Sequence, residues 1–117
     1  MPEFIATNPL RLADMFEGVR CLSFGHLGDG NVHHHVQPPL GVDGKAWLAQ
    51  YGHDASRAVY RHVMELGGSL SAEHGIGQMK RDILAELDSR ARLAALRAVK
   101  QGMDPYFICN PDKLIKR

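Results

Sequence analysis

A long amphipathic helix is the feature that most constrains the fold of this chain. Between Lys45 and Leu66 the apolar side chains recur at helical spacing, which predicts one continuous helix with an apolar face. Gly67 and Gly68 follow directly, as is typical of a helix C-terminus. Such a helix buries its apolar face against a sheet or other helices.

A β-hairpin with a glycine-rich tip is predicted before this helix. The segments VRCLSF (19–24) and NVHHHVQ (31–37) have the alternation of strands, and Gly28, Asp29 and Gly30 supply the turn between them. After the helix, the segment SLSAEHG (69–75) predicts a third short strand that ends at Glu73 and His74.

Three more helices complete the predicted set. Residues 2–16 predict a helix interrupted near Asn8 and Pro9, because proline disfavours helical geometry in the residue before it. Residues 79–87 and 90–103 are also helical in pattern, with Asp88 or Ser89 as the cap of the second. The element order predicts an α+β fold, a small and mostly antiparallel sheet covered by helices on one face. The length of 117 residues predicts one compact unit.

The composition excludes several classes of protein. With 44% hydrophobic and 23% charged residues and a net charge of +1, the chain is globular and has no basic stripe for nucleic acid. No apolar run approaches the roughly 20 residues that cross a bilayer, and the first residues show no secretion signal. Cys21 and Cys109 lie far apart, which predicts two small buried residues in a reducing, cytoplasmic compartment rather than a disulfide.

Four of the seven histidines lie in the segment GHLGDGNVHHH. Strand alternation places His33 and His35 on one face of the hairpin and His34 on the other. His26 lies just before the turn, where side chains of neighbouring strands come within reach of each other. His26 and His33 are therefore predicted to converge on one point.

Two imidazoles that bind a divalent metal usually recruit a carboxylate. Glu73, at the end of the predicted third strand, is the candidate, and the neighbouring His74 is a candidate general base. Asp29 and Asn31 in the tip are predicted to orient the histidines through hydrogen bonds.

The same residues also have structural interpretations. A histidine in a small domain is more often a hydrogen-bonded core residue than a ligand. His34 is interpreted as a strand residue on the opposite face, His53 and His62 as surface or packing residues, and Glu73 as a solvated carboxylate. The hairpin glycines match neither the dinucleotide fingerprint nor the P-loop, and they join two strands, so a nucleotide loop is excluded.

Three motifs together carry a family resemblance. FGHLGDGNVHHHV is followed after a helix by GGSLSAEHGIGQMKRDIL, and the chain closes with ICNPDKLI. In this order they resemble the C-terminal portion of the FAD-linked oxidase family, which includes D-lactate dehydrogenase, the FAD-bearing glycolate oxidase subunit and D-2-hydroxyglutarate dehydrogenase. The resemblance covers nearly the whole chain. It implies a ferredoxin-like half of that domain and an enzyme that oxidises a D-2-hydroxy acid to the 2-oxo acid, with FAD accepting the hydride.

The resemblance also assigns roles to residues. It implies three ligands for a divalent metal, usually zinc: His26, His33 and Glu73. His74 would take the proton of the substrate hydroxyl, and Asn110 would approach the flavin. Two positions depart from the family pattern, because His35 replaces an asparagine and Asp112 replaces a glycine.

The resemblance places the FAD-binding domain outside this chain, which has no glycine loop suited to a dinucleotide. We therefore expect a piece of a longer protein, or a small subunit that works beside a flavin-bearing partner and is inactive alone. A sheet edge or apolar face left exposed would favour a homo-dimer. The alternatives are a non-catalytic metal-binding or assembly module and a structural fragment whose histidines bind nothing.

Overall fold

The computed structural model describes residues 1–116, which form two compact units divided after Gly68. The single compact unit expected from the length is therefore wrong. Residues 66–80, which join the units, contain no helix or strand. Each unit has its own buried apolar side chains: Phe4, Leu12, Trp47 and Ala55 in the first, and Leu70, Leu84, Leu93 and Ile115 in the second.

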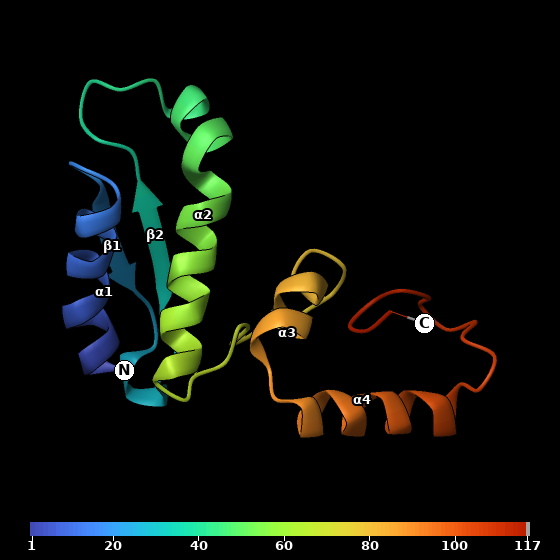
Figure 1. Ribbon diagram of the computed structural model, residues 1–117. Helices are drawn as coiled ribbons and strands as arrows, with labels where there is room; N and C mark the ends of the chain where they lie inside the picture. Colours follow the sequence, from blue (N-terminus) through green and yellow to red (C-terminus); the bar gives the residue numbers. More distant parts are fainter. Residues whose placement is uncertain (117) are drawn as a thin grey trace. The chain divides into compact units, whose positions relative to one another are not determined.

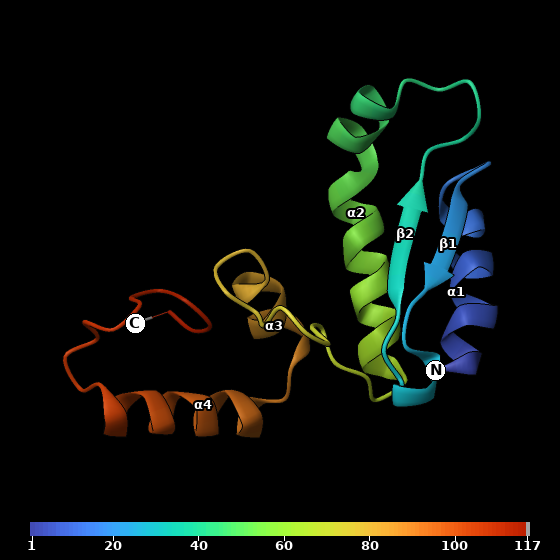
Figure 2. The same ribbon diagram turned by 180° about the vertical axis from the view of Figure 1, so that it is seen from behind.

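The first unit is a hairpin covered by two helices. Its elements in order are α1 (Pro2–Met15), β1 (Arg20–Phe24), the short 3-10 helix η1 (Leu27–Asp29), β2 (His33–Gln37) and α2 (Gly44–Glu65). The strands pair antiparallel, with Phe24 opposite His33. Both helices lie on the same side of the strands, which are behind them in Figure 1 and in front in Figure 2. The α+β class and the covered sheet face are confirmed.

The long helix α2 confirms the strongest pattern in the sequence. Asp43 caps its first turn by accepting a hydrogen bond from the Lys45 amide (2.9 Å). At the other end Gly67 has a φ of +71°, a left-handed conformation that glycine adopts without a steric penalty. Trp47 in the first turn packs against Phe16, with ring centroids 6.0 Å apart, and so joins α2 to the end of α1.

The interruption predicted in the first helix is wrong, since α1 continues through Pro9. The preceding residue, Asn8, is 1% exposed. Its side-chain amide contacts His34 at 2.8 Å and His62 at 3.0 Å. These tertiary contacts hold Asn8 in helical geometry and outweigh the local preference that proline imposes.

The second unit contains α3 (Arg81–Leu87) and α4 (Arg90–Met103). Ser89 caps α4 as predicted, accepting a hydrogen bond from the Arg92 amide (3.1 Å). The third strand predicted at residues 69–75 is wrong, because none of the described residues of this unit forms a strand. Only Leu70 of that segment is buried, and the sheet has two strands, both in the first unit.

The two cysteines are free thiols, as predicted. Cys21 is partly buried, but Cys109 is exposed, which corrects the expectation that both are buried. Cys109 lies outside the helices, in the segment that follows α4. None of the helices in the described part of the chain is long and apolar enough to span a membrane.

Candidate functional site

The hairpin has one covered and one open face. Along β1 and β2 the exposure alternates from residue to residue, so Ser23 and His34 lie beneath the helices. His33 and His35 lie on the open face beside Phe24. The predicted alternation of the three histidines is thereby confirmed.

An aromatic side chain lies between the two open-face histidines. The Phe24 ring stacks on His33, with centroids 5.4 Å apart and planes 28° apart, and its centroid is 5.2 Å from that of His35. Phe24 is 49% exposed. Sequence reasoning missed this residue, although the register that places Phe24 opposite His33 follows from a symmetric hairpin about the tip.

The tip of the hairpin is held by the backbone of His26. Its carbonyl accepts hydrogen bonds from the amides of Asp29 (3.0 Å) and Asn31 (3.1 Å). Gly30 ends the short 3-10 turn with a φ of +70°, a conformation that favours glycine. The orienting roles predicted for the side chains of Asp29 and Asn31 stay predictions.

A polar network lies beneath the hairpin, where sequence reasoning expected only a strand residue and a packing residue. The Asn8 amide bridges His34 on β2 and His62 on α2, and the other ring nitrogen of His34, Nδ1, lies 2.7 Å from Ser23 Oγ. Burial lowers the pKa of both histidines, with neighbouring His35 adding to the effect at His34 and Arg11 adding to it at His62. The lowered pKa favours the neutral form of both rings.

Glu73 and His74 lie together in an exposed loop of the second unit. Nε2 of His74 is 3.8 Å from Oε2 of Glu73, and the His74 side chain is 81% exposed. An imidazole in this position is open to a small molecule and has a carboxylate beside it. That arrangement is compatible with the base role predicted for His74.

The closing motif is attached to the loop that follows His74. The Leu114 amide donates to the Gly77 carbonyl (2.8 Å), and Arg81 donates to the Asp112 carbonyl (2.7 Å). The second and third motifs of the sequence are therefore neighbours within one unit. No local pattern could predict this, because the partners are more than 30 residues apart in sequence.

The closing motif also has an unusual backbone. Asn110 and Asp112 have φ values of +45° and +57°, in the left-handed region that favours glycine. Residue 112, where the family resemblance implies a glycine, thus has a backbone conformation that glycine favours while carrying an aspartate. This conformation suits a glycine and carries a steric penalty for a residue with a Cβ atom.

We expect the substitution Asp112→Gly to stabilise the second unit by about 0.5–1 kcal/mol, because it relieves the left-handed strain. The hydrogen bond from Arg81 is preserved, since it is made to the backbone carbonyl of residue 112. Urea unfolding of both proteins measures the difference. Asp112→Ala is the control, because it retains the Cβ atom and should bring no gain; an equal gain in both variants would contradict the explanation.

The predicted metal ligands lie in different units of the chain. Among residues 1–116 there is no group of three or more histidine, cysteine, aspartate or glutamate side chains that could hold an ion. His26 and His33 belong to the first unit and Glu73 to the second. Two imidazoles and a carboxylate are chemically suited to zinc, but this set stays a prediction.

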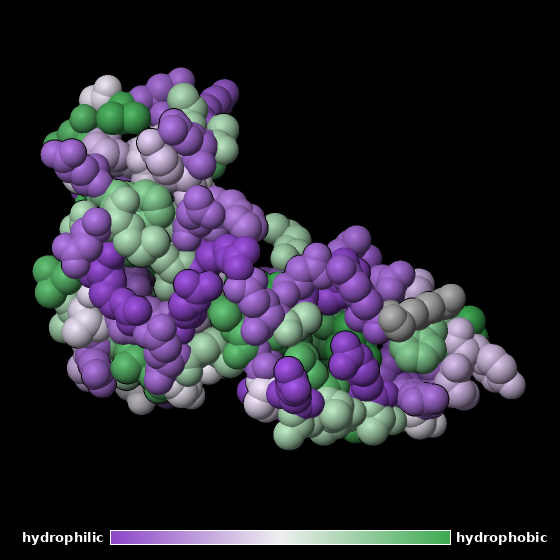
Figure 3. Space-filling model, in the orientation of Figure 1, coloured by the Kyte–Doolittle hydropathy of each residue, from purple (hydrophilic) through white to green (hydrophobic). Residues whose placement is uncertain are grey.

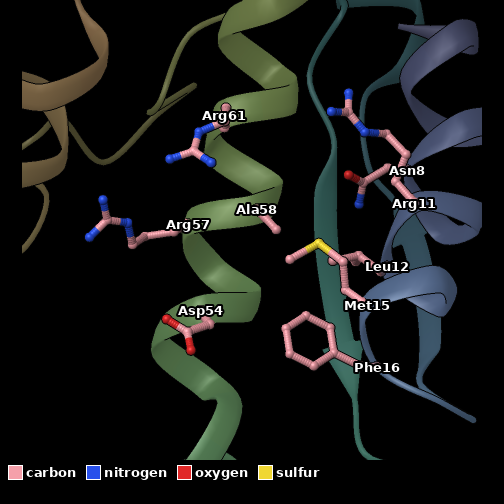
Figure 4. Close-up of a pocket in the computed structure, with 9 residues that line it drawn as sticks. All are labelled: Asn8, Arg11, Leu12, Met15, Phe16, Asp54, Arg57, Ala58 and Arg61. Atoms are coloured by element: carbon pink, nitrogen blue, oxygen red, sulfur yellow. The ribbon is translucent and has the colours of Figure 1, made fainter.

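A groove on the opposite side of the first unit contains none of the predicted site residues. It lies between α1 and α2, has a volume of about 300 Å³, and is lined by apolar side chains such as Phe16 and Ala58 and by Arg11, Arg57 and Arg61 (Figure 4). Hydrophilic side chains surround the hollow on this face (Figure 3). Because Arg11 is paired with Glu65 (2.5 Å), part of the positive charge is already neutralised.

Comparisons with known proteins agree with this arrangement of motifs. The family model of the C-terminal domain of FAD linked oxidases matches residues 3–114. A D-2-hydroxyglutarate dehydrogenase of Xanthomonas citri is 33% identical over 116 residues, which are 99% of this chain and 24% of that protein. A D-lactate dehydrogenase of Archaeoglobus fulgidus is 36% identical over 100 residues, or 86% of this chain and 21% of the relative.

A glycolate oxidase subunit of Bacillus subtilis is 30% identical over 95 residues, which cover 81% of this chain and 20% of the relative. The chain therefore spans between a fifth and a quarter of the length of these three proteins. The family model covers the histidine hairpin, the loop around His74 and the closing motif as far as residue 114, including Asn110. On these grounds the chain belongs to the FAD-linked oxidase family and corresponds to its C-terminal domain.

Proposed function

We propose that this chain is the substrate-binding portion of an FAD-dependent oxidoreductase that oxidises a D-2-hydroxy acid of the lactate, glycolate or 2-hydroxyglutarate type. One observation carries the proposal, the match of residues 3–114 to the family domain. The exposure of His33, His35 and His74 supports it, because side chains that serve only the core would be buried.

The proposed reaction removes two electrons and two protons from the substrate, as one hydride and one proton. The C2 hydrogen leaves as a hydride, the hydroxyl oxygen loses its proton, and the C2–O bond becomes the carbonyl of the 2-oxo acid. FAD, bound by another domain or subunit, supplies the hydride acceptor. His74 takes the hydroxyl proton on its imidazole, with Glu73 beside it to stabilise the imidazolium.

Further residues have proposed roles around the substrate. We propose His26, His33 and Glu73 as ligands of a divalent metal, with zinc the first candidate, and Asn110 as the residue nearest the flavin. His35, Asn31 and Asp29 would contact the substrate or orient the ligands. The free cysteines agree with a cytoplasmic setting.

Zinc binding by the purified chain tests the ligand set. We expect the His26→Ala, His33→Ala double variant to lose at least tenfold in zinc affinity, since both proposed imidazole ligands are gone. Isothermal titration calorimetry measures the affinity. His53→Ala is the matched control, because that side chain is 80% exposed on α2 and should leave the affinity unchanged.

A second experiment, titration with hydroxy acids, distinguishes the substrate-binding portion of an enzyme from a module that binds only metal. Addition of D-lactate or D-2-hydroxyglutarate should shift the NMR signals of the His74 ring, and the L-enantiomers should have a smaller effect. Equal zinc affinity in the double variant and in His53→Ala would overturn the ligand set. An absence of signal shifts with every D-2-hydroxy acid would overturn the substrate role.

A non-catalytic assembly module is the second candidate function. The open face of the hairpin favours it, because Leu22 and Phe24 are 52% and 49% exposed there and such apolar surface is typical of an interface. Zinc binding without any response to hydroxy acids, together with a stable homo-dimer or a complex with a flavoprotein subunit, would favour this candidate.

A further inference from the structure

A network of hydrogen-bonding groups crosses the interior of the first unit. Asn8 lies at its centre, with the amide nitrogen Nδ2 placed 2.8 Å from Nε2 of His34 and the amide oxygen Oδ1 placed 3.0 Å from Nδ1 of His62. The network has five contacts of 2.7–3.2 Å and joins β1, β2, α1 and α2. Its members in order are the side chains of Ser23, His34, Asn8, His62 and Thr7 and the backbone carbonyl of Glu3. Each of the four contacts to a histidine ring can be made in one of two directions, depending on which ring nitrogen carries the proton.

Thr7 determines which groups donate and which accept along this network. Its hydroxyl oxygen lies 2.7 Å from the Glu3 carbonyl and 3.2 Å from Nε2 of His62. A hydroxyl has a single proton, and a carbonyl can only accept, so that proton goes to Glu3. The contact with His62 then requires a proton on Nε2 of the ring. In a neutral imidazole the other nitrogen, Nδ1, is therefore an acceptor.

This assignment fixes the remaining contacts. Since Nδ1 of His62 accepts, the NH₂ group of Asn8 must face His62 and the Asn8 oxygen must face His34. This assignment exchanges the two amide atoms relative to their placement in the structure. Nε2 of His34 then donates to Asn8, and its Nδ1 accepts from the Ser23 hydroxyl. All five contacts become hydrogen bonds. With Nδ2 toward His34 and Oδ1 toward His62, the Thr7 hydroxyl would have to donate to both of its neighbours, and one of the five bonds is lost.

We propose that Asn8 is a positioning residue: its amide joins the sheet to both helices and fixes which face of β2 carries His33 and His35. The proposal deepens the proposed function and rests on it for the significance of His33. It also goes beyond that function, because Asn8 lies beneath the sheet on α1 and belongs to none of the three family motifs.

The hairpin is short, so contacts outside its two strands contribute to its register. Its ladder has only five residue pairs, and a slip by one residue would move every side chain of β2 to the opposite face. Such a slip would place His34 on the open face and leave Asn8 and Ser23 without their partner. The cost of unpaired polar groups inside the unit therefore opposes the slip.

The first test is the protonation pattern of the imidazoles in the wild-type chain. Long-range ¹H–¹⁵N NMR spectra at pH 7.5 distinguish the two neutral tautomers. We expect the proton on Nε2 in both His34 and His62. A proton on Nδ1 in either ring would overturn the donor and acceptor roles assigned to the network.

The second test uses Asn8→Leu and a matched pair at the far end of the network. In Asn8→Leu we expect amide hydrogen exchange in β2 to accelerate at least tenfold, and the NOEs between the Phe24 and His33 rings to weaken. Ser23→Ala should accelerate exchange severalfold, whereas Ser23→Thr, which retains the hydroxyl, should behave as wild type. The Ser23 pair keeps the test decisive if Asn8→Leu does not fold.

The outcomes separate this inference from the proposed function. Unchanged β2 exchange and ring NOEs in both Asn8→Leu and Ser23→Ala would overturn the positioning role. These measurements need no metal, so they decide the role of Asn8 even if the wild-type chain fails to bind zinc. If the wild type binds zinc, a folded Asn8→Leu variant should bind at least tenfold more weakly, and equal affinity would also overturn the inference.

Discussion

The substitution Leu12→Ala should destabilise the first unit by about 3 kcal/mol, because it removes a fully enclosed side chain and leaves a cavity between the two helices. Leu12 has an exposed fraction of 0% and lies on the face of α1 that packs on α2 and the sheet. Urea unfolding followed by NMR measures the loss for each unit, since signals of Trp47 report on the first and signals of Leu93 on the second.

Leu10→Ala is the control for this experiment. Leu10 lies on the same helix but is 68% exposed, so its truncation should cost far less. Because the buried side chains of the two units form separate sets, we expect Leu12→Ala to lower the midpoint of the Trp47 signals alone. An equal decrease in both sets of signals would show that the units unfold as one.

The substitution Asp104→Ala should release the segment that carries Asn110. The two carboxylate oxygens of Asp104 accept hydrogen bonds from the amides of Ile108 and Cys109, both at 3.0 Å, and the side chain is paired with Lys100. The hydrogen bond from Lys100, helped by the two amides, lowers the pKa of Asp104. Hydrogen exchange at the Ile108 and Cys109 amides should therefore accelerate more than tenfold in the variant.

Asp104→Asn is the graded control. It retains one oxygen that can accept from one of the two amides, so protection should be lost at one position and largely kept at the other. Equal protection of both amides in wild type and Asp104→Ala would show that the segment is held by its other contacts, such as the Leu114 amide on the Gly77 carbonyl.

Local patterns in the sequence predicted the local structure well. The spacing of apolar residues gave the extent of α2, and strand alternation placed His33 and His35 on the opposite face from His34. Where a distant contact decides the conformation, the same reasoning failed. Proline predicted a break in α1, which Asn8 prevents through its contacts with His34 and His62.

The candidate site also has features that the sequence predicts and features that it does not. The residue types at the tip and at Glu73 and His74 are visible in the sequence, and so is their order along the chain. The stacking of Phe24, the network beneath the hairpin and the attachment of the closing motif depend on contacts between segments far apart in sequence. A third strand was predicted at residues 69–75 because a short apolar and polar alternation does not reveal whether a partner strand exists.

Each unit contains one free cysteine, Cys21 in the first and Cys109 in the second, and the two thiols differ in reactivity. Burial raises the pKa of Cys21, so less of the nucleophilic thiolate is present at neutral pH, while the exposed Cys109 is open to reagents. A maleimide dye added briefly at neutral pH should therefore attach to Cys109 first, and a second dye can follow at Cys21 under mildly denaturing conditions. The native sequence thus permits site-selective double labelling for energy-transfer measurements without the introduction of a single cysteine.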